Sequence, residues 1–240
     1  TTQSPTQELV DTYRKLDGSV ADDTDYEKRD KRFEATIAYN NCTVDIPEAK
    51  TLSLAGSEGT GKGTYQVFTK ASDESQTSDK QHRFDSYNGT QDRTATGYYT
   101  LKNYNADMVD SKGNTYKSLM EIRYADVLLM YAEASTRATN SVNTQAIQAI
   151  QEIQKRAGYA DSQLTTTTDP TAFTTAVSNE RGWEFFAEMK RWFELVRLEK
   201  VSEVRAETWD GSLFQRNNHY YFPIPYQQIE LTQWTNNAGY

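Results

Sequence analysis

The segment IRYADVLLMYAEA, residues 122–134, decides how this chain folds. Its apolar side chains recur at helical spacing on nearly every side, which is typical of a helix that several neighbours bury. Glu133 and Arg137 stand four residues apart, the spacing at which opposite charges pair along a helix. The sequence therefore predicts a buried helix that begins near Leu119 and ends with this ion pair.

A second helix follows after a turn at residues 140–143, which ends in a potential capping residue. Apolar side chains form one stripe between Ala146 and Ala157, with glutamine and lysine side chains opposite. Gly158 then stands where a glycine commonly ends a helix. We expect the two helices to form a hairpin of roughly 35 to 40 residues, close to the size of a tetratricopeptide unit.

Two further helices and a tail complete the second half of the chain. Asp169 and Pro170 give the start signal of a third helix, an N-cap residue followed by proline. We expect this helix to continue to Glu188. A fourth helix is expected over residues 191–200, and the prolines within residues 220–225 predict an extended tail.

The first half has weaker periodicity and more turn residues. Residues 6–16 predict a short helix, and alternating apolar residues over 33–39 predict a half-buried strand. A glycine-rich stretch at 54–63 is followed by strand-favouring side chains at 65–68, and residues 98–104 predict one more short strand. We expect a mainly α fold: tetratricopeptide-like helical hairpins, an irregular loop-rich region and a few short strands.

The two halves are expected to differ in role within one domain. We expect residues 1–118 to form a loop-rich ligand-facing region, and residues 119–240 to form the helical scaffold with its extended C-terminal tail. Only 36% of the residues are hydrophobic, but 4 Trp, 16 Tyr and 9 Phe are among them. Because aromatic side chains bury large areas, this composition still supports a folded core.

Charge and composition exclude several classes of function. The 26 basic residues against 34 acidic ones give a net charge of −8, without the basic stripe that nucleic-acid binding requires. No apolar stretch approaches the roughly 20 residues of a membrane-spanning helix. Cys42 is the single cysteine and the two histidines are far apart, so we expect no disulfide, no metal and no cofactor.

Two catalytic patterns are incomplete. Gly56, Gly61 and Lys62 have the spacing of a phosphate-binding loop, but Gly63 replaces the hydroxyl residue that would bind magnesium, and strand formers follow in place of a helix. Neither histidine lies near a nucleophile motif. The sequence therefore gives no positive evidence for an enzyme.

A group of charged residues in the third and fourth helices has two interpretations. Glu180 and Glu184 lie on one helical face, like the acid and base of a glycosidase, which makes hydrolysis a minor alternative. Among aromatic neighbours, however, opposite charges compensate each other's desolvation. We interpret this group as a structural ion-pair network, and its members are Glu180, Arg181, Glu184 and Arg191.

Aromatic residues beside polar ones are the candidates for ligand binding. Sugar rings stack their C–H faces on aromatic side chains, while their hydroxyl groups need polar partners. The alternative is that most of these aromatic residues fill a thin core. The candidate ligand-binding residues are Tyr13, Tyr26, Tyr98, Tyr99, Tyr104, Trp209 and Asp210.

Several segments, in order along the chain, resemble the SusD/RagB family of outer-membrane nutrient-binding lipoproteins. They are residues 5–10, 29–33, 35–37, 122–134, 146–159, 180–185, 191–197, 222–225 and 237–240. The sequence departs from the family pattern at Gly182 and Met189, where the family more often has Arg and Gly, and at Lys31, where Pro is common. The combination covers the chain from residue 5 to its end.

The resemblance implies a helical scaffold whose loops build the ligand surface. It also implies that this chain is about the C-terminal half of a family member. The other half would hold the signal peptide, the lipidated cysteine and the earlier helical repeats. Cys42 lies mid-chain without a lipobox and is not that cysteine.

Family members lie on the cell surface and cover a TonB-dependent transporter, to which they pass glycans or sometimes peptides. The resemblance therefore implies a non-catalytic, lipid-anchored glycan-binding component of such an uptake system. The alternative is an interaction scaffold that docks the transporter without binding sugar itself.

Overall fold

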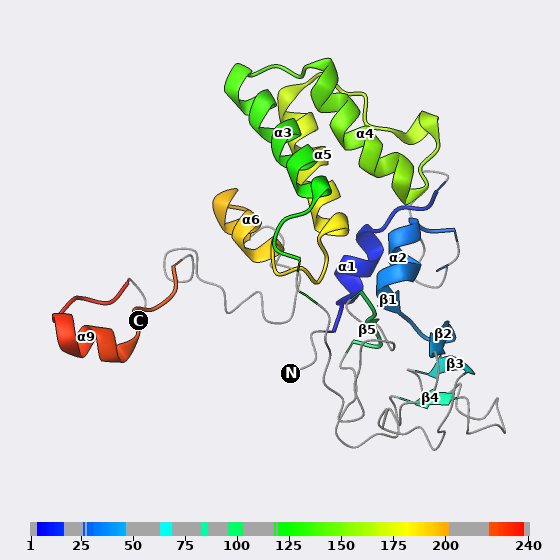
Figure 1. Ribbon diagram of the computed structural model, residues 1–240, viewed down its shortest axis with the longest axis horizontal. Helices are drawn as coiled ribbons and strands as arrows, with labels where there is room; N and C mark the ends of the chain where they lie inside the picture. Colours follow the sequence, from blue (N-terminus) through cyan, green and yellow to red (C-terminus); the bar gives the residue numbers. More distant parts are fainter. Residues whose placement is uncertain are drawn as a thin grey trace. The chain divides into compact units, whose positions relative to one another are not determined.

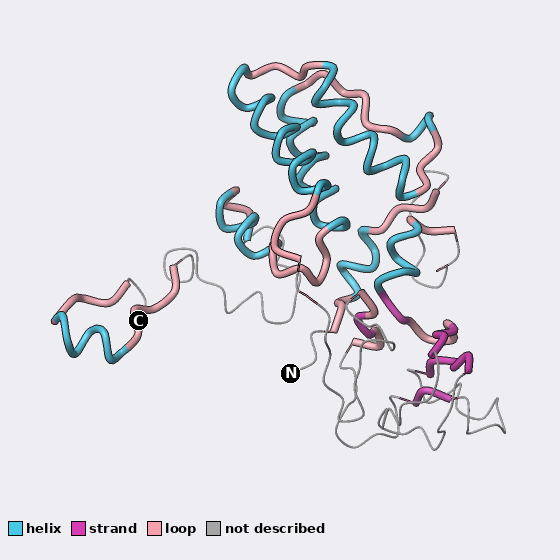
Figure 2. Tube along the Cα trace, in the orientation of Figure 1, coloured by secondary structure: helices cyan, strands magenta, loops and turns pink. Residues whose placement is uncertain are grey.

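The computed structural model describes residues 4–16, 26, 28–46, 63–68, 83–85, 96–102, 118, 120–201 and 221–237. The chain divides into two compact units, Thr1–Glu188 and Met189–Tyr240. The mainly helical fold class is confirmed, and the short strands among the described residues lie between residues 37 and 100 (Figure 2). The division by role at residue 118 stays a prediction, and the glycine-rich stretch before residue 63 lies outside the described residues.

The predicted helical hairpin is confirmed as α3 (Tyr124–Thr139) and α4 (Thr144–Ala157). The Asn143 side chain accepts a hydrogen bond from the Ala146 amide at 2.8 Å and thereby caps the start of α4. Gly158 ends α4 with φ +99°, a left-handed conformation that favours glycine. Helix α3 begins five residues later than the predicted start near Leu119.

Helix α5 (Pro170–Glu184) packs against α3 and α4 to complete a three-helix layer (Figure 1). The Asp169 side chain accepts from the Ala172 amide at 2.6 Å, which confirms the predicted start signal. Between α4 and α5 lies the short 3-10 helix η4 (Asp161–Gln163). The predicted continuation of α5 to Glu188 is wrong, because the chain turns after Glu184 and Ala187 has φ +60°.

The core of this layer combines small and large apolar side chains. Leu129, Ala132, Ile150, Phe173 and Val177 are fully buried against one another. Alanine in α3 and α4 lets the helices approach closely, and Phe173 fills the remaining volume. Burying each large side chain contributes about 1.5 to 3 kcal/mol. This layer therefore holds a continuous apolar core within the first unit.

The N-terminal segment forms two short helices. Helix α1 (Gln7–Thr12) is capped by Thr6, whose hydroxyl accepts from the Leu9 amide at 3.3 Å, and it ends before the predicted residue 16. The strand predicted over 33–39 is wrong for most of its length, since residues Lys31–Thr36 form helix α2. Asp30 caps α2 by accepting from the Arg32 amide at 2.9 Å, and this cap decides for helix against strand.

Two small sheets follow. Strand β1 (Ile37–Ala38) pairs antiparallel with β5 (Tyr99–Thr100), so the strand predicted over 98–104 is present but only two residues long. Strands β2 (Thr43–Ile46), β3 (Gly63–Phe68) and β4 (Arg83–Asp85) form a sheet in that order. The β2–β3 pair is antiparallel and the β3–β4 pair is parallel. The predicted strand at 65–68 is confirmed within β3.

The second unit holds α6 (Arg191–Arg197), shorter than the predicted 191–200, and α9 (Tyr226–Thr232), which the sequence analysis did not predict. Residues 221–225 contain no helix, as their prolines predict, but the expected extended tail is interrupted by α9. The Ile224 amide donates to the Asn236 side chain at 2.8 Å, and the Asn237 side chain donates to the Phe222 carbonyl at 2.6 Å. These two bonds close the segment around α9 into a loop.

Candidate functional site

The first candidate site is a cluster of aromatic rings beside α1 and α2, here called the aromatic cluster: Tyr13, Tyr26, Phe33, Tyr39 and Tyr98. Tyr26 stacks on Tyr39 with ring centroids 4.3 Å apart, and Phe33 stacks on Tyr39 at 5.4 Å. Tyr13 meets Phe33 edge-on at 5.5 Å. Such pairs add about 0.5 to 1.5 kcal/mol each beyond the area that they bury.

The candidate ligand residues fall into three groups. Tyr13 and Tyr98 are buried, with 0% and 3% of their surface exposed, and they pack in the core as the alternative interpretation expects. Tyr26, in the same cluster, and Tyr99, on β5, are half-buried and keep part of their surface accessible. Tyr104, Trp209 and Asp210 lie outside the described residues. A ligand-binding role stays a prediction for all seven candidates.

A chain of hydrogen bonds runs from the aromatic cluster to the surface of α1. The Tyr26 and Tyr98 hydroxyls are 3.0 Å apart, and the Tyr98 hydroxyl donates to the Gln7 side chain at 2.7 Å. The Gln7 amide in turn donates to Asp11 at 2.8 Å. Burial raises the pKa of Tyr98, and its bond with Tyr26 adds to the shift, so the Tyr98 phenol stays protonated. The cluster thus places stacking and hydrogen-bonding groups side by side.

The buried side chain of Arg29 packs against the rings of the aromatic cluster. Its guanidinium lies over the rings of Tyr26 and Phe33 at 5.4 and 5.1 Å and donates to the Val10 carbonyl at 2.6 Å. The side chain is almost fully buried. Cation–π contacts with desolvated rings contribute about 2 kcal/mol. Arg29 therefore fixes the position of the Tyr26 ring, although the sequence analysis gave this arginine no role.

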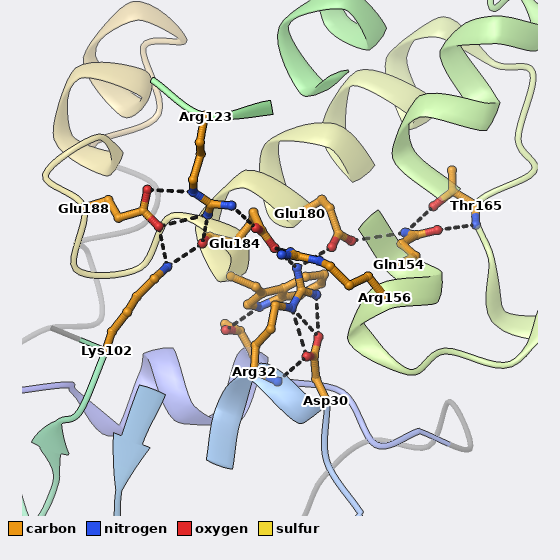
Figure 3. A network of polar contacts seen from close by, with 12 residues as sticks. Asp30, Arg32, Lys102, Arg123, Gln154, Arg156, Thr165, Glu180, Glu184 and Glu188 are labelled. Carbon is orange, nitrogen blue, oxygen red and sulfur yellow. Dashed lines mark hydrogen bonds and ion pairs between the residues drawn. The ribbon is translucent and has the colours of Figure 1, made fainter. Parts of the chain in front are cut away.

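The second candidate site is a network of charged side chains at the C-terminal end of α5 (Figure 3). Its centre is Glu184, which is 2% exposed. One carboxylate oxygen of Glu184 accepts from Arg123, and the other accepts from Arg32 at 3.0 Å and from Arg156. Three arginines from different parts of the chain therefore converge on one carboxylate.

Arg32 extends the network towards α2 and α4. Its guanidinium pairs with Asp30 and donates to Glu180 at 2.6 Å. The other oxygen of Glu180 accepts from the Gln154 side chain at 3.1 Å. Gln154 is itself fixed, because its carbonyl accepts from the Thr165 amide at 2.9 Å. Arg32 thus bridges Glu180 and Glu184, the two carboxylates of the glycosidase alternative.

Lys102 and Glu188 close the network on the other side. Lys102 donates to the Glu184 backbone carbonyl at 2.6 Å and pairs with Glu188 at 2.6 Å. The Arg123 guanidinium also donates two hydrogen bonds to the carboxylate of Glu188, at 3.1 and 2.9 Å. The turn after α5 is therefore tied both to residues before α3 and to the segment that follows β5.

The electrostatic effects on the three glutamates differ. Burial raises the pKa of Glu180, and Arg32 only partly opposes it. Burial also acts to raise the pKa of Glu184, but hydrogen bonds from Arg123 and Arg156 outweigh it and lower the pKa to about 2. The pKa of Glu188 is lowered in the same way, since bonds from Arg123 and Lys102 outweigh its burial.

This arrangement is suited to holding segments together and not to proton transfer. Hydrolysis of glycosides requires two carboxyl groups that flank an open space for the sugar. Here the Arg32 guanidinium occupies the space between Glu180 and Glu184, with bonds to both. The network contains four carboxylates, which belong to Asp30, Glu180, Glu184 and Glu188. They pair with four basic side chains, which belong to Arg32, Lys102, Arg123 and Arg156. Over the described residues, no cluster of three or more possible metal-ligating side chains occurs.

Two residues that the sequence analysis placed in the network, Arg181 and Arg191, contact acidic residues other than Glu180 and Glu184. An amino group of Arg181 is 4.0 Å from Asp126, and the guanidinium lies over the Phe185 ring. Arg191 pairs with Glu194 at 3.3 Å within the second unit. The sequence could have indicated that Arg181 faces away from the two glutamates. Residues 180 and 184 share one helical face, and residue 181 is rotated by about 100° from it. The true partners come from distant segments, which spacing does not reveal.

Fold and site together define a class of protein. Helices α3, α4 and α5 form a tetratricopeptide-like layer. Buried ion pairs at the end of α5 join this helical scaffold to α2 and to the segment before α3. The chain belongs to the SusD family, since the model of this family matches residues 2–240. Comparison of the sequence with curated proteins gave no match.

Solved structures show the same fold. A SusD-like protein from Bacteroides fragilis NCTC 9343 is 21% identical with a TM-score of 0.64, over 99% of this chain and 47% of its own. A SusD-like carbohydrate binding protein from the same organism is 20% identical with a TM-score of 0.56, over 85% and 39%. A laminarin binding SusD-like protein is 18% identical with a TM-score of 0.53, over 99% and 49%. The chain therefore spans less than half the length of these relatives.

Proposed function

We propose that this chain is part of a non-catalytic glycan-binding protein that serves nutrient uptake at the cell surface. The observation that carries the proposal is the family match over residues 2–240. Relatives of the same fold are named as carbohydrate binding and laminarin binding proteins. The aromatic cluster supplies a chemistry that suits such a ligand.

The binding mechanism would combine ring stacking with hydrogen bonds. The accessible part of the Tyr26 side chain would contact the C–H groups of a sugar, and Arg29 and Tyr39, which lie over the ring, keep it in place. Gln7 and Asp11 are exposed next to it and would bond sugar hydroxyl groups. No bond of the ligand changes, because the buried carboxylates are held by arginines. Tyr99, Tyr104, Trp209 and Asp210 remain candidates for further ligand contacts.

The location and partners of the whole protein are part of the same proposal. We infer a lipid anchor in the outer membrane, through a segment that is not in this chain, and a TonB-dependent transporter that receives the glycan. Among the residues that the structure describes, no helix is both long and apolar enough to cross a membrane. A scaffold that docks the transporter without binding sugar is the alternative.

Calorimetry against a panel of soluble polysaccharides, laminarin included, tests the proposal. We expect heat of binding for at least one glycan, and Tyr26→Ala should weaken it at least about tenfold if stacking contributes 1.4 kcal/mol or more. Tyr226→Ala is the matched control, since Tyr226 is an exposed tyrosine on α9 outside the cluster.

Two results would overturn the proposal. No binding across the panel, together with capture by the purified transporter, would favour the scaffold. Release of reducing sugar that Glu184→Gln abolishes would show an enzyme.

A further inference from the structure

The hydrogen bonds that join Tyr26, Tyr98, Gln7 and Asp11, here called the hydrogen-bond chain, all run in one direction. A carboxylate can only accept hydrogen bonds. Asp11 therefore turns the amino group of the Gln7 amide towards itself, at 2.8 Å, and the Gln7 carbonyl faces the other way. That carbonyl accepts from the Tyr98 hydroxyl at 2.7 Å. The charge on Asp11 thus decides which end of the Gln7 side chain faces the aromatic cluster.

The same direction continues to Tyr26. A tyrosine hydroxyl has one proton to donate, and Tyr98 donates its proton to Gln7. In the 3.0 Å bond between the two tyrosine hydroxyls, Tyr26 is therefore the donor and Tyr98 the acceptor. Burial raises the pKa of Tyr98, and the nearby charge of Asp11 adds to the rise, so this proton stays on Tyr98. The Tyr26 hydroxyl is left with lone pairs only, as an acceptor for any further partner.

The hydrogen-bond chain reaches the surface on α1. Tyr98 is 3% exposed, whereas Gln7 and Asp11 are exposed and lie on one face of α1, one helical turn apart. Each of these two residues keeps one polar group for a ligand. Gln7 has the second N–H of its amide, which donates, and Asp11 has the second oxygen of its carboxylate, which accepts. The exposed end of the hydrogen-bond chain is therefore a donor beside a charged acceptor.

Sugar hydroxyl groups fit this pair of groups, and anionic groups do not. A hydroxyl both donates and accepts, so neighbouring hydroxyls of one sugar can donate to Asp11 and accept from Gln7. A carboxylate or sulfate group can only accept, and opposite Asp11 it would meet a like charge. Helix α1 offers no compensating charge, because its charged residues, Glu8 and Asp11, are both acidic.

We propose that Asp11 is a specificity-determining residue, which fixes the direction of the hydrogen-bond chain so that the site takes neutral sugars with free hydroxyl groups and rejects uronic acids and sulfated sugars. This inference rests on the proposed function, since it specifies which glycans the aromatic cluster takes. Glu8 provides the contrast. It is an exposed acidic residue of the same helix, but it takes no part in the hydrogen-bond chain and does not set its direction.

Calorimetry with matched polysaccharides tests this proposal. The probes are laminarin, pullulan and dextran, the sulfated derivative of each, and polygalacturonate. We expect a neutral glycan to bind at least about tenfold more tightly than its own sulfated derivative, because the sulfate meets the charge of Asp11. Asp11→Asn should raise the affinity for the sulfated derivative and lower this ratio to less than about threefold, since an asparagine side chain can also donate. Glu8→Gln is the matched control and should leave the ratio unchanged.

A second variant tests the direction of the bonds themselves. Tyr98→Phe keeps the ring in the core and removes the acceptor of the Tyr26 proton, so Tyr26 can then donate to a ligand. We expect this variant to gain affinity for the sulfated derivative, and a loss of folding cannot produce such a gain.

The outcomes separate this inference from the proposed function. Equal affinity for neutral and sulfated glycans, or binding of polygalacturonate alone, would overturn the inference and leave glycan binding in place. A ratio that falls as far in Glu8→Gln as in Asp11→Asn would also overturn it, because the charge of the helix would then be the cause and not the direction of the bonds. No binding of any probe would overturn both.

Discussion

The bridge that Arg32 makes between α2 and α5 gives the sharpest test of how this fold is held together. Replacing Arg32 by methionine keeps the length of the side chain and removes its charge. Glu180, which is 0% exposed, then keeps only the bond from Gln154. An uncompensated buried carboxylate costs about 3 to 5 kcal/mol. Because whole domains are stable by only about 5 to 15 kcal/mol, this loss is large.

The expected loss is measurable by thermal unfolding followed by circular dichroism. For a chain of this size we expect the melting temperature of Arg32→Met to fall by about 6 to 20 °C. Arg156→Met is the matched control: its side chain is 58% exposed, it pairs with the same Glu184, and its loss should cost at most about 1 kcal/mol. Adding Glu180→Gln to Arg32→Met should restore part of the stability, since it removes the unpaired charge. Equal melting temperatures for the two single variants would refute this reasoning.

Three further predictions follow from the same structure. Lowering the pH should destabilise the fold through Glu184, whose pKa is about 2 in the fold against the ordinary 4.5. This difference contributes about 3 kcal/mol to the free energy of unfolding, which is present above pH 4.5 and is lost as the pH falls towards 2. Urea titrations at several pH values should show that the free energy of unfolding of Glu184→Gln depends less on pH. Phe173→Ala should cost about 3 to 5 kcal/mol by leaving a cavity among α3, α4 and α5, which denaturant midpoints will measure against the exposed control Thr171→Ala. Met189→Gly should stabilise the fold by up to about 1 kcal/mol, because Met189 is exposed and has φ +60°. Gly158→Ala should destabilise the fold by about 1 kcal/mol, because Gly158 has φ +99°. Differential scanning calorimetry should show that the melting temperature rises for the first variant and falls for the second.

The second half of the chain was predictable because its signals are local. The Asn143 cap, the Gly158 stop and the Asp169–Pro170 start each depend on side chains within three residues of a helix end. The apolar stripe of α4 likewise needs only its own sequence. The helical hairpin and α5 therefore followed from the sequence with errors of a few residues at their ends.

Helix α2 was missed because two local signals compete there. Phe33, Ala35, Ile37 and Tyr39 stand at every second position, which favours a strand. The buried Phe33 and Thr36, however, are three residues apart, which is the spacing of one helical face. The Asp30 cap decides the outcome, and backbone bonds hold Asp30 in place, since its amide donates to the Arg14 carbonyl at 2.8 Å. A contact across 16 residues of chain is not visible in a window of sequence.

The candidate site was predicted only in part for the same reason. The acidic members of the network stand on one face of α5 and could be found, but Arg32, Lys102 and Arg123 come from segments far away in sequence. In the aromatic cluster, composition indicated tyrosines near a ligand surface. It did not show that Tyr13 and Tyr98 are buried while Tyr26 is half-buried, because burial is a property of tertiary packing.

The distance along the chain between Arg32 and its partners also sets an order of events during synthesis. Glu180 leaves the ribosome 148 residues after Arg32, which is about 7 to 30 s at ordinary rates of translation. During that interval the Arg32 guanidinium has Asp30 as a partner but lacks its bonds to Glu180 and Glu184, so we expect α2 to stay accessible to proteases and chaperones until α5 is made. Within this chain, folding is therefore expected to begin with the α3–α4 hairpin, and α2 is expected to join it only after α5 has formed.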